Sequence, residues 1–346
     1  MNLADQRAIE SKTAVSVSSP DCGLSRRRHL LGGAAAVAAW ATQPGGNSRA
    51  AAAEVVVASG IKGGKGVVAL ADGSFIAPEF VTGNILRISS TGDKRILASI
   101  GFGAAGAAAG PDGTVYVCKM SPASMGGGRA GPSFGAVYRI DLATDAIKPL
   151  YRNDPDGKPL PGPNDLVFDN YGDFWFSDYA AGKVYCARAD GSGLKLVVPD
   201  LPGAHGIVLS PDRTILYVIF TGAGASRANP PKKIAAYPIT SRATLDLSAQ
   251  RVLGPFPVAG QFDGLRMEAG GNLLAASWEG GIVAISPDGK LLGQTAVGGG
   301  KAVISVTFCG PDLRQVVCMV NGPSGPGSGF MIRLPWPRAG LRLVNG

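Results

Sequence analysis

Six turn-forming sites recur along this chain and divide it into similar segments. The sites begin at Asp72, Asp112, Tyr171, Asp212, Gly270 and Asp312, and the positions seven residues earlier are Lys65, Ala105, Asn164, His205, Asp263 and Ser305. These earlier positions are 40, 59, 41, 58 and 42 residues apart. Such a period is typical of a β-propeller, in which each blade starts its innermost strand at the central channel. We therefore expect an all-β, six-bladed β-propeller. Its six "ring positions", as we call these earlier residues, should face one another at one channel mouth.

Each repeat opens with an apolar run, turns, and then becomes apolar again, as in 164–178 and 263–278. Near-continuous apolar runs favour strands that are packed on both faces between neighbouring blades. Six blades of about 40 to 50 residues fill 54–346 as a single domain. Residues 330–334 and 341–344 are expected to form the last outer strands, and 54–58 to complete the last blade and close the ring.

The first 53 residues have the pattern of an export signal. A twin-arginine sequence, SRRRHLL at 25–31, precedes a short apolar run at 32–41 and an alanine-rich stretch at 50–53. This order predicts twin-arginine export, cleavage, and a periplasmic or secreted protein. A basic amphipathic start and a membrane anchor are the alternatives. No apolar run of 18 or more residues follows, so no stable membrane insertion is expected after cleavage.

The charge of the chain is modest and evenly spread. The formal net charge is +8, and the leader contributes six basic and three acidic residues to it. The rest of the chain contains no basic run interleaved with aromatic residues, so we expect no nucleic-acid partner. A small-molecule partner is expected instead, and the sequence carries no signal about oligomeric state.

Four cysteines follow the leader, and none belongs to a CxxC pair. This spacing argues against a zinc ribbon. Cys309 and Cys318 flank one turn and could form a disulfide in an oxidising compartment, whereas buried small apolar side chains are the other interpretation.

Several segments carry a resemblance to a known family. They are 163–169 (PNDLVFD), 174–178 (FWFSD), 205–207 (HGI), 210–212 (SPD) and 262–265 (FDGL). In order and spacing they are similar to motifs of the senescence marker protein/gluconolactonase (regucalcin-like) family over nearly the whole chain after the leader. The resemblance implies a six-bladed propeller. Many members bind one divalent cation, often calcium or zinc, at the channel mouth and hydrolyse sugar lactones or related esters.

The family's site is only partly retained in this sequence. The resemblance implies that Asp263 corresponds to the ligand aspartate, which is also considered the general base, and that Asn164 corresponds to the first ligand asparagine. His205 stands at the second asparagine position and Lys65 at the glutamate position. Many members carry a substrate-binding arginine two residues before the first asparagine, where this chain has Gly162.

These substitutions leave two kinds of site open. In the first, Asp263, Asn164 and His205 hold zinc or calcium, and water completes the shell. Lys65 opposes this reading, because an ammonium donates hydrogen bonds and cannot ligate a cation. In the second, Lys65 acts as a base or Schiff-base nucleophile and His205, oriented by Asp263, moves a proton. No organic cofactor is expected in either case.

Three acidic residues end second strands that return to the ring face: Glu79, Asp178 and Glu279. We expect these three residues and Asn164 to contact substrate. Glu79 lies in the same hairpin as Lys65, so we also expect an ion pair between these two residues.

The sequence therefore predicts an exported hydrolase that acts on a lactone or small ester, with Asp263 activating water. The alternatives are a metal-independent lyase, isomerase or cyclase that uses Lys65 and His205, and a periplasmic propeller that only binds a ligand. Fold alone does not decide among them.

Overall fold

The computed structural model describes residues 53–125, 134–222, 232–299, 301–322 and 328–343. All of them belong to the second of two compact units, Gly45–Gly346. The predicted leader, apart from its last residue, lies outside the described residues. Within the described ranges, no helix combines the length and the apolar character needed to span a bilayer.

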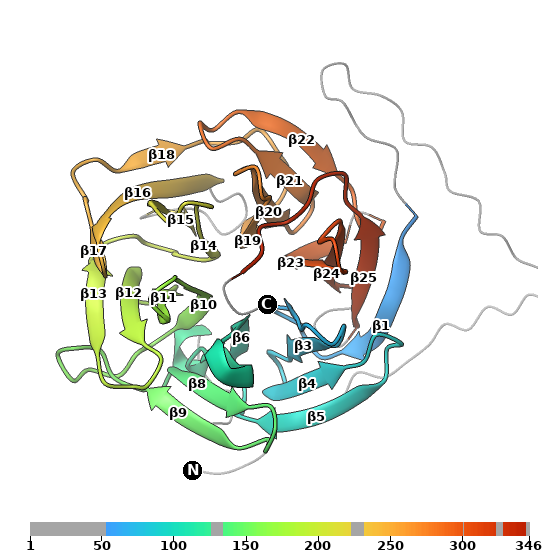
Figure 1. Cartoon of the computed structure of the whole chain (residues 1–346), viewed down its shortest axis with the longest axis horizontal. Helices are drawn as coiled ribbons and strands as arrows, with labels where there is room; N and C mark the ends of the chain where they lie inside the picture. Colours follow the sequence, from blue (N-terminus) through green and yellow to red (C-terminus); the bar gives the residue numbers. More distant parts are fainter. Residues whose placement is uncertain (1–52, 126–133, 223–231, 300, 323–327, 344–346) are drawn as a thin grey trace, which may run out of the picture. The chain divides into compact units, whose positions relative to one another are not determined.

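Six antiparallel sheets surround a central axis, each forming one blade of a propeller (Figure 1). Blade 1 contains β2 (Val68–Ala69), β3 (Phe75–Pro78), β4 (Asn84–Ile88) and β5 (Lys94–Ser99). Blade 2 contains β6 (Ala104–Ala109), β7 (Thr114–Lys119), β8 (Ala136–Asp141) and β9 (Ile147–Tyr151), with short 3₁₀ helices η1 (Pro111–Gly113) and η2 (Pro122–Met125) before and after β7. Blade 3 contains β10 (Pro163–Phe168), β11 (Asp173–Asp178), β12 (Lys183–Arg188) and β13 (Leu194–Val198).

The other three blades follow the same plan. Blade 4 contains β14 (Ile207–Leu209), β15 (Ile215–Phe220), β16 (Lys233–Ser241), β17 (Thr244–Leu245) and β18 (Arg251–Leu253). Blade 5 contains β19 (Phe262–Met267), β20 (Leu273–Ser277), β21 (Gly281–Ile285) and β22 (Leu291–Thr295). Blade 6 contains β23 (Ala302–Cys309), β24 (Gln315–Asn321), β25 (Gly329–Pro335) and β1 (Val55–Ile61).

The innermost strands touch in the closed order β2, β6, β10, β14, β19, β23 and back to β2. Each hydrophobic cluster draws on two neighbouring blades, so each fills one of the interfaces between blades. Strands β10 and β11 are buried at every position, as expected for strands packed on both faces. The six-bladed all-β propeller predicted from the sequence is confirmed.

The ring is closed by the first and last strands of the propeller. Strand β1 pairs antiparallel with β25, from Val55 opposite Arg333 to Ile61 opposite Gly329. The predicted closure by 54–58 is thereby confirmed and extends to residue 61. The predicted outer strand at 341–344 is wrong for its described part, because the C-terminal segment turns inward across the propeller axis (Figure 1). There Leu341 N donates to Met267 O at 2.8 Å.

The four cysteines after the leader are buried free thiols. Cys309 packs in the cluster between blades 6 and 1, whereas Cys318 packs in the cluster between blades 5 and 6. The two side chains therefore face opposite sides of blade 6. This geometry excludes the disulfide considered from the sequence and supports the interpretation as small apolar core residues.

Candidate functional site

The ring positions form a tight circle of backbone at one end of the inner strands. Ser305 Oγ donates to Lys65 O at 2.8 Å, and Gly206 N donates to Asp263 O at 2.9 Å. Gly206 directly follows a ring position, as do Gly66, Gly106 and Gly264. A Cβ at Gly206 would lie 2.4 Å from Asp263 O. Glycine is therefore required here because the neighbouring inner strand is too close for any side chain.

Local irregularities in the inner strands aim the ring side chains. The pairing register shifts between Phe262 and Leu265 in blade 5 and between Pro163 and Leu166 in blade 3. A β-bulge adds a residue to one strand and redirects the side chain beside it. These two bulges contain Asp263 and Asn164, respectively.

Lys65 and Asp263 form an ion pair across the circle. Lys65 Nζ lies 2.7 Å from Asp263 Oδ2, although 198 residues separate them in the sequence. Trp278 Nε1 donates to the same oxygen at 3.0 Å. Burial alone would raise the pKa of Asp263, but the charge of Lys65, the neighbouring His205 and the hydrogen bonds from Lys65 and Trp278 outweigh it, so the pKa lies below its usual value. Asp263 is therefore a carboxylate at neutral pH.

His205 lies on the other side of this carboxylate. Its Nδ1 is 3.7 Å from Asp263 Oδ1, is buried, and has no hydrogen-bond partner among the described residues. The pKa of His205 is lowered to about 4. Burial is the main cause and the charge of Lys65 adds to it, whereas Asp263 acts in the opposite direction. The imidazole is therefore neutral at pH 7.

Gln261 fixes which imidazole nitrogen carries the proton. Its amide nitrogen lies 3.0 Å from His205 Nε2. An amide nitrogen only donates, so Nε2 accepts and Nδ1 bears the ring proton on the side of Asp263. Tyr179 covers the imidazole, with ring centroids 4.5 Å apart.

Tyr179 and Trp278 belong to a second circle around the mouth. In four blades a residue one or two positions after the second strand donates its backbone N–H to the carbonyl two residues before the ring position, at 2.8 to 3.0 Å. The four donors are Phe80, Met120, Tyr179 and Trp278, and we call them the collar. Three of them contact ring side chains, the third contact being from Asn164 Nδ2 to Met120 Sδ at 3.5 Å.

The acidic residues at the ends of second strands do not join this site. Glu79 accepts hydrogen bonds from Lys62 N, in the segment that leads into blade 1, and from Thr82 Oγ1 and Asn84 Nδ2, at the following turn. The ion pair expected between Lys65 and Glu79 is therefore wrong, and Asp263 takes its place. These local donors satisfy the Glu79 carboxylate more directly than a lysine that points toward the axis.

Asp178 and Glu279 are also separate from the ring contacts. The carboxylate of Asp178 accepts from Gly162 N at 3.2 Å and Ala181 N at 2.8 Å, and burial raises its pKa to about 6. Its side chain is fully buried in its own turn, which contradicts the expected contact with substrate. Glu279 is exposed beside Trp278 and makes no described contact with the ring.

Sequence reasoning missed Gln261, Tyr179 and Trp278. A signal for Gln261 was present, because glycine stands two residues before the ring position in four other blades. Those residues are Gly63, Gly103, Gly162 and Gly203. The collar also had a signal in the sequence, because each of its four members stands 15 residues after a ring position.

The channel mouth does not fit a divalent cation. Lys65 occupies one oxygen of Asp263 with a positive charge, and the proton on His205 Nδ1 blocks the nitrogen that faces this carboxylate. The amide nitrogen of Asn164 is turned to Met120 Sδ. A cation would need unprotonated donors and no ammonium beside them. The expected metal set of Asp263, Asn164 and His205 is therefore not assembled in this arrangement.

One other group of metal-ligand side chains occurs in the described part of the chain: Asp169, Asp173 and Cys186. Asp173 already pairs with Arg242 through both oxygens, at 2.8 and 2.9 Å. Asp169 accepts from Trp175 Nε1, and burial raises the pKa of Cys186 to about 12. A protonated thiol beside two occupied carboxylates is a poor ligand set.

The fold and these contacts define a six-bladed propeller with a small, ionisable site at one channel mouth. The sequence matches the SMP-30/Gluconolactonase/LRE-like region over residues 37–319, and the chain belongs to that family. A gluconolactonase from Zymomonas mobilis is 26% identical over 287 residues, which cover 73% of this chain and 75% of the relative.

Solved structures share the fold. A gluconolactonase from Xanthomonas campestris superposes with a TM-score of 0.67 at 22% identity, covering 83% of this chain and 90% of the other. A calcium-binding regucalcin from Agrobacterium tumefaciens gives a TM-score of 0.61 at 19% identity, covering 82% and 95%.

Proposed function

We propose that this chain hydrolyses a lactone or small carboxylic ester at the channel mouth and that it does so without a bound metal. The family and its gluconolactonase relatives support the reaction class. The observation that carries the metal-free assignment is the 2.7 Å ion pair between Lys65 Nζ and Asp263 Oδ2 beside a neutral, unpartnered His205 Nδ1.

Asp263 is the base in this proposal. Its Oδ2 receives the hydrogen bonds from Lys65 and Trp278, whereas Oδ1 receives none from the described residues. Oδ1 takes a proton from water, and the resulting hydroxide oxygen bonds to the carbonyl carbon. When the ring carbon–oxygen bond breaks, the same proton passes to the departing alkoxide. Lactone and water thus become a hydroxy acid, and Asp263 returns to its starting state.

Lys65 and His205 stabilise the charge that develops on the carbonyl oxygen. The ammonium of Lys65 supplies the positive charge that a metal supplies in other enzymes. The neutral imidazole of His205 donates from Nδ1, which has no other acceptor in the described part of the chain. Preorganised donors of this kind contribute about 3 to 4 kcal/mol each to transition-state stabilisation.

The collar favours a flat or cyclic substrate over an extended one. Trp278 is 41% exposed, and Tyr179 is half-buried above His205. Aromatic faces at a mouth pack against the ring of a lactone. Gly162 offers no side chain for the hydroxyl groups of a sugar, so the proposed substrate is a lactone with few hydroxyls.

The lyase, isomerase and cyclase alternatives lose support from the geometry. A Schiff-base mechanism requires a free amine lone pair, and Lys65 is an ammonium that donates to Asp263 at 2.7 Å. The ion pair instead suits electrostatic stabilisation.

The test is hydrolysis of γ-valerolactone and glucono-1,5-lactone by purified chain starting at residue 53, with and without a chelator. We expect turnover of the valerolactone that the chelator leaves unchanged. Asp263→Asn should lower kcat by at least about 100-fold in a protein that still unfolds cooperatively above the assay temperature. Asp288→Asn, in an exposed turn, is the matched control. Loss of activity with the chelator, or full activity in Asp263→Asn, would refute the proposal.

We also propose that the chain is exported by the twin-arginine route. The motif at 25–31 and the apolar run at 32–41 support this, and the described fold begins where the alanine-rich stretch ends. Replacing Arg26, Arg27 and Arg28 by lysine should leave the protein uncleaved in the cytoplasm, as fractionation would show. Normal export of that variant would contradict the proposal.

A further inference from the structure

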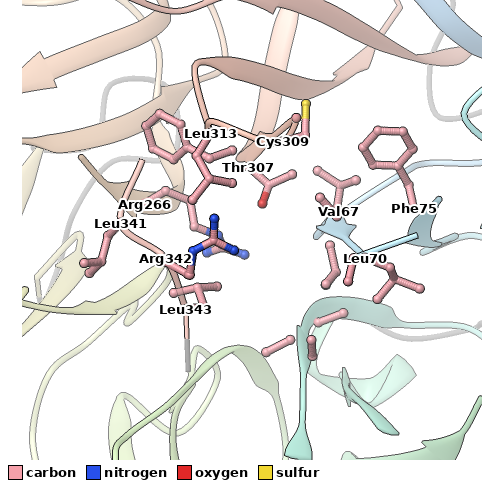
Figure 2. A pocket seen from close by; sticks show the side chains of 18 of the residues that line it. Val67, Leu70, Phe75, Arg266, Thr307, Cys309, Leu313, Leu341, Arg342 and Leu343 are labelled. Carbon is pink, nitrogen blue, oxygen red and sulfur yellow. The ribbon is translucent and has the colours of Figure 1, made fainter. Parts of the chain in front are cut away.

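The far end of the channel holds a cavity of about 610 Å³ (Figure 2). It is lined by the second halves of the inner strands, by the turns that follow them, and by the C-terminal segment 341–343. None of the six ring positions is among its lining residues. The cavity is therefore a separate space from the proposed catalytic site, and its volume suits a small organic ligand.

The wall of this cavity is mostly apolar. Val67, Leu70 and Phe75 lie on one side in Figure 2, whereas Leu341 and Leu343 lie on the other. An apolar wall of this kind favours a hydrocarbon body.

Arg266 is a buried cation in this wall. Its residue is 8% exposed, and Nη1 donates to Leu265 O at 2.7 Å and pairs with Asp165 Oδ2 at 3.3 Å. Nε is buried without a hydrogen-bond partner, and Nη2 makes no hydrogen bond to a described residue. Donors left unused on a buried guanidinium cost free energy unless a ligand accepts from them.

Arg342 adds a second positive charge on the same side of the cavity in Figure 2. It is exposed and forms no ion pair with a described residue. Arg333 also lines the cavity, whereas Asp72, the lining acid, already pairs with Arg87 at 2.5 Å. The uncompensated charge of the cavity is therefore positive.

We propose that this cavity binds an amphipathic carboxylate, with the carboxylate between Arg266 and Arg342 and the hydrocarbon body against Val67, Leu70 and Phe75. A guanidinium fork matches a carboxylate in geometry and charge. This site is distinct from the lactone site, so the two proposals stand or fall separately.

The probe is sodium octanoate, titrated calorimetrically into the chain that starts at residue 53. We expect one molecule bound per chain. Octanol, which lacks the charge, should bind at least about tenfold more weakly, and inorganic phosphate, which lacks the hydrocarbon body, should give no measurable heat. Equal affinity for octanol, or binding of phosphate at the same site, would overturn the proposal.

Variants locate the bound octanoate. Arg342→Gln should weaken octanoate binding by about tenfold and leave lactone hydrolysis unchanged, whereas Arg188→Gln, an exposed arginine outside the cavity, should alter neither. Leu70→Trp should narrow the cavity where the hydrocarbon body is proposed to lie and weaken binding by about tenfold or more. Retained affinity in Arg342→Gln or in Leu70→Trp would refute the site.

A last variant separates the two ends of the channel. His205→Asn alters the ring and leaves the cavity lining intact, so octanoate should bind it with unchanged affinity. A matching loss of octanoate affinity in this variant would place the ligand at the ring and overturn the cavity assignment.

Discussion

Lys65 decides the chemistry of the channel mouth more than any other residue. A glutamate there would offer oxygen ligands to a cation, and the lysine instead offers an ammonium to Asp263. This one side chain therefore contributes a positive charge to the channel mouth and favours the ionised form of Asp263. Lys65 also affects the neighbouring His205, because a buried imidazole beside an ammonium stays neutral.

Restoring the acidic residue should restore cation binding. Lys65→Glu removes the ammonium from Asp263 and adds a carboxylate, so calcium or zinc should bind at about one ion per chain, at least tenfold more tightly than to the parent chain. Calorimetric titration with each ion measures this. Lys62→Glu, an exposed position three residues away, is the control. Equal cation affinity in both variants would show that Lys65 does not exclude the metal.

The neutral His205 predicts a pH effect on stability. Its pKa is about 4 in the folded chain against 6.5 for the free side chain. Between these pH values the unfolded state binds more protons, so the contribution of His205 to stability is lost as pH falls from 6.5 toward 4. Relative to His205→Asn, the parent chain should lose up to about 3 kcal/mol across this window.

Urea unfolding of both proteins at pH 7 and pH 4.5 measures the difference. The comparison with His205→Asn removes the effect of Asp178, whose raised pKa of about 6 changes stability in the opposite direction. Parallel pH dependence in the two proteins would contradict a buried neutral imidazole.

Sequence and structure agree least well where contacts are long-range. The ring positions can be found in the sequence because they repeat along the chain. This repeat predicts that Lys65, His205 and Asp263 lie on one circle. It could not say which members touch. The favoured partner of Lys65 was Glu79 in the same hairpin, but backbone and side-chain donors only 3 to 17 residues away satisfy Glu79. The actual partner is 198 residues away and is reached only after the propeller closes.

Among the elements, the inner strands position the side chains of the site. A ring position lies at or within three residues of the start of each inner strand, and glycine follows it in four of the six blades. At Gly66, Gly106 and Gly206 the neighbouring backbone lies too close for a Cβ. The site is therefore held by contacts between blades and not by flexible loops, which limits how far its side chains can move.

Gly206→Ala should disturb two blades at once. The new methyl would lie 2.4 Å from Asp263 O and 2.6 Å from Leu265 N, so β14 and β19 must separate. We expect a loss of about 1 to 3 kcal/mol in stability, measured by urea unfolding, together with reduced hydrolysis. Gly270→Ala, where no atom lies within 4 Å, is the control. An unchanged Gly206→Ala protein would contradict this tight packing.

The C-terminal segment shows why periodicity alone misassigned one element. Residues 341–343 have the apolar character of a strand, but blade 6 already has its four strands. Buried Glu268 instead anchors the chain just before this segment, accepting from Trp336 Nε1 at 2.7 Å and from Arg338. Apolar residues are buried both in an outer strand of a blade and in a segment that lines the far end of the channel. The apolar pattern of the sequence does not distinguish these two places.

At the scale of the whole molecule, closure depends on β1. This strand covers the outer edge of β25 and completes blade 6. Without it, the backbone groups of β25 would form an open edge that can pair with other chains.

Deleting β1 should therefore remove the cooperative fold. A chain that starts at residue 62 is expected to aggregate or to melt more than about 10 °C below a chain that starts at residue 53. Thermal unfolding and size-exclusion chromatography measure the difference. Equal melting temperatures would show that the propeller closes without β1.

The pairing of β1 with β25 in blade 6 also determines when the parts of the propeller can fold during synthesis. Among the described strands, β1 leaves the ribosome first and β25 last, so β1 has no partner while the chain between them is made. Blades 1 to 5 contain only consecutive strands and can fold as they emerge. The ring contact between Lys65 and Asp263 spans most of this interval, so this ion pair cannot form before blade 5 has been made.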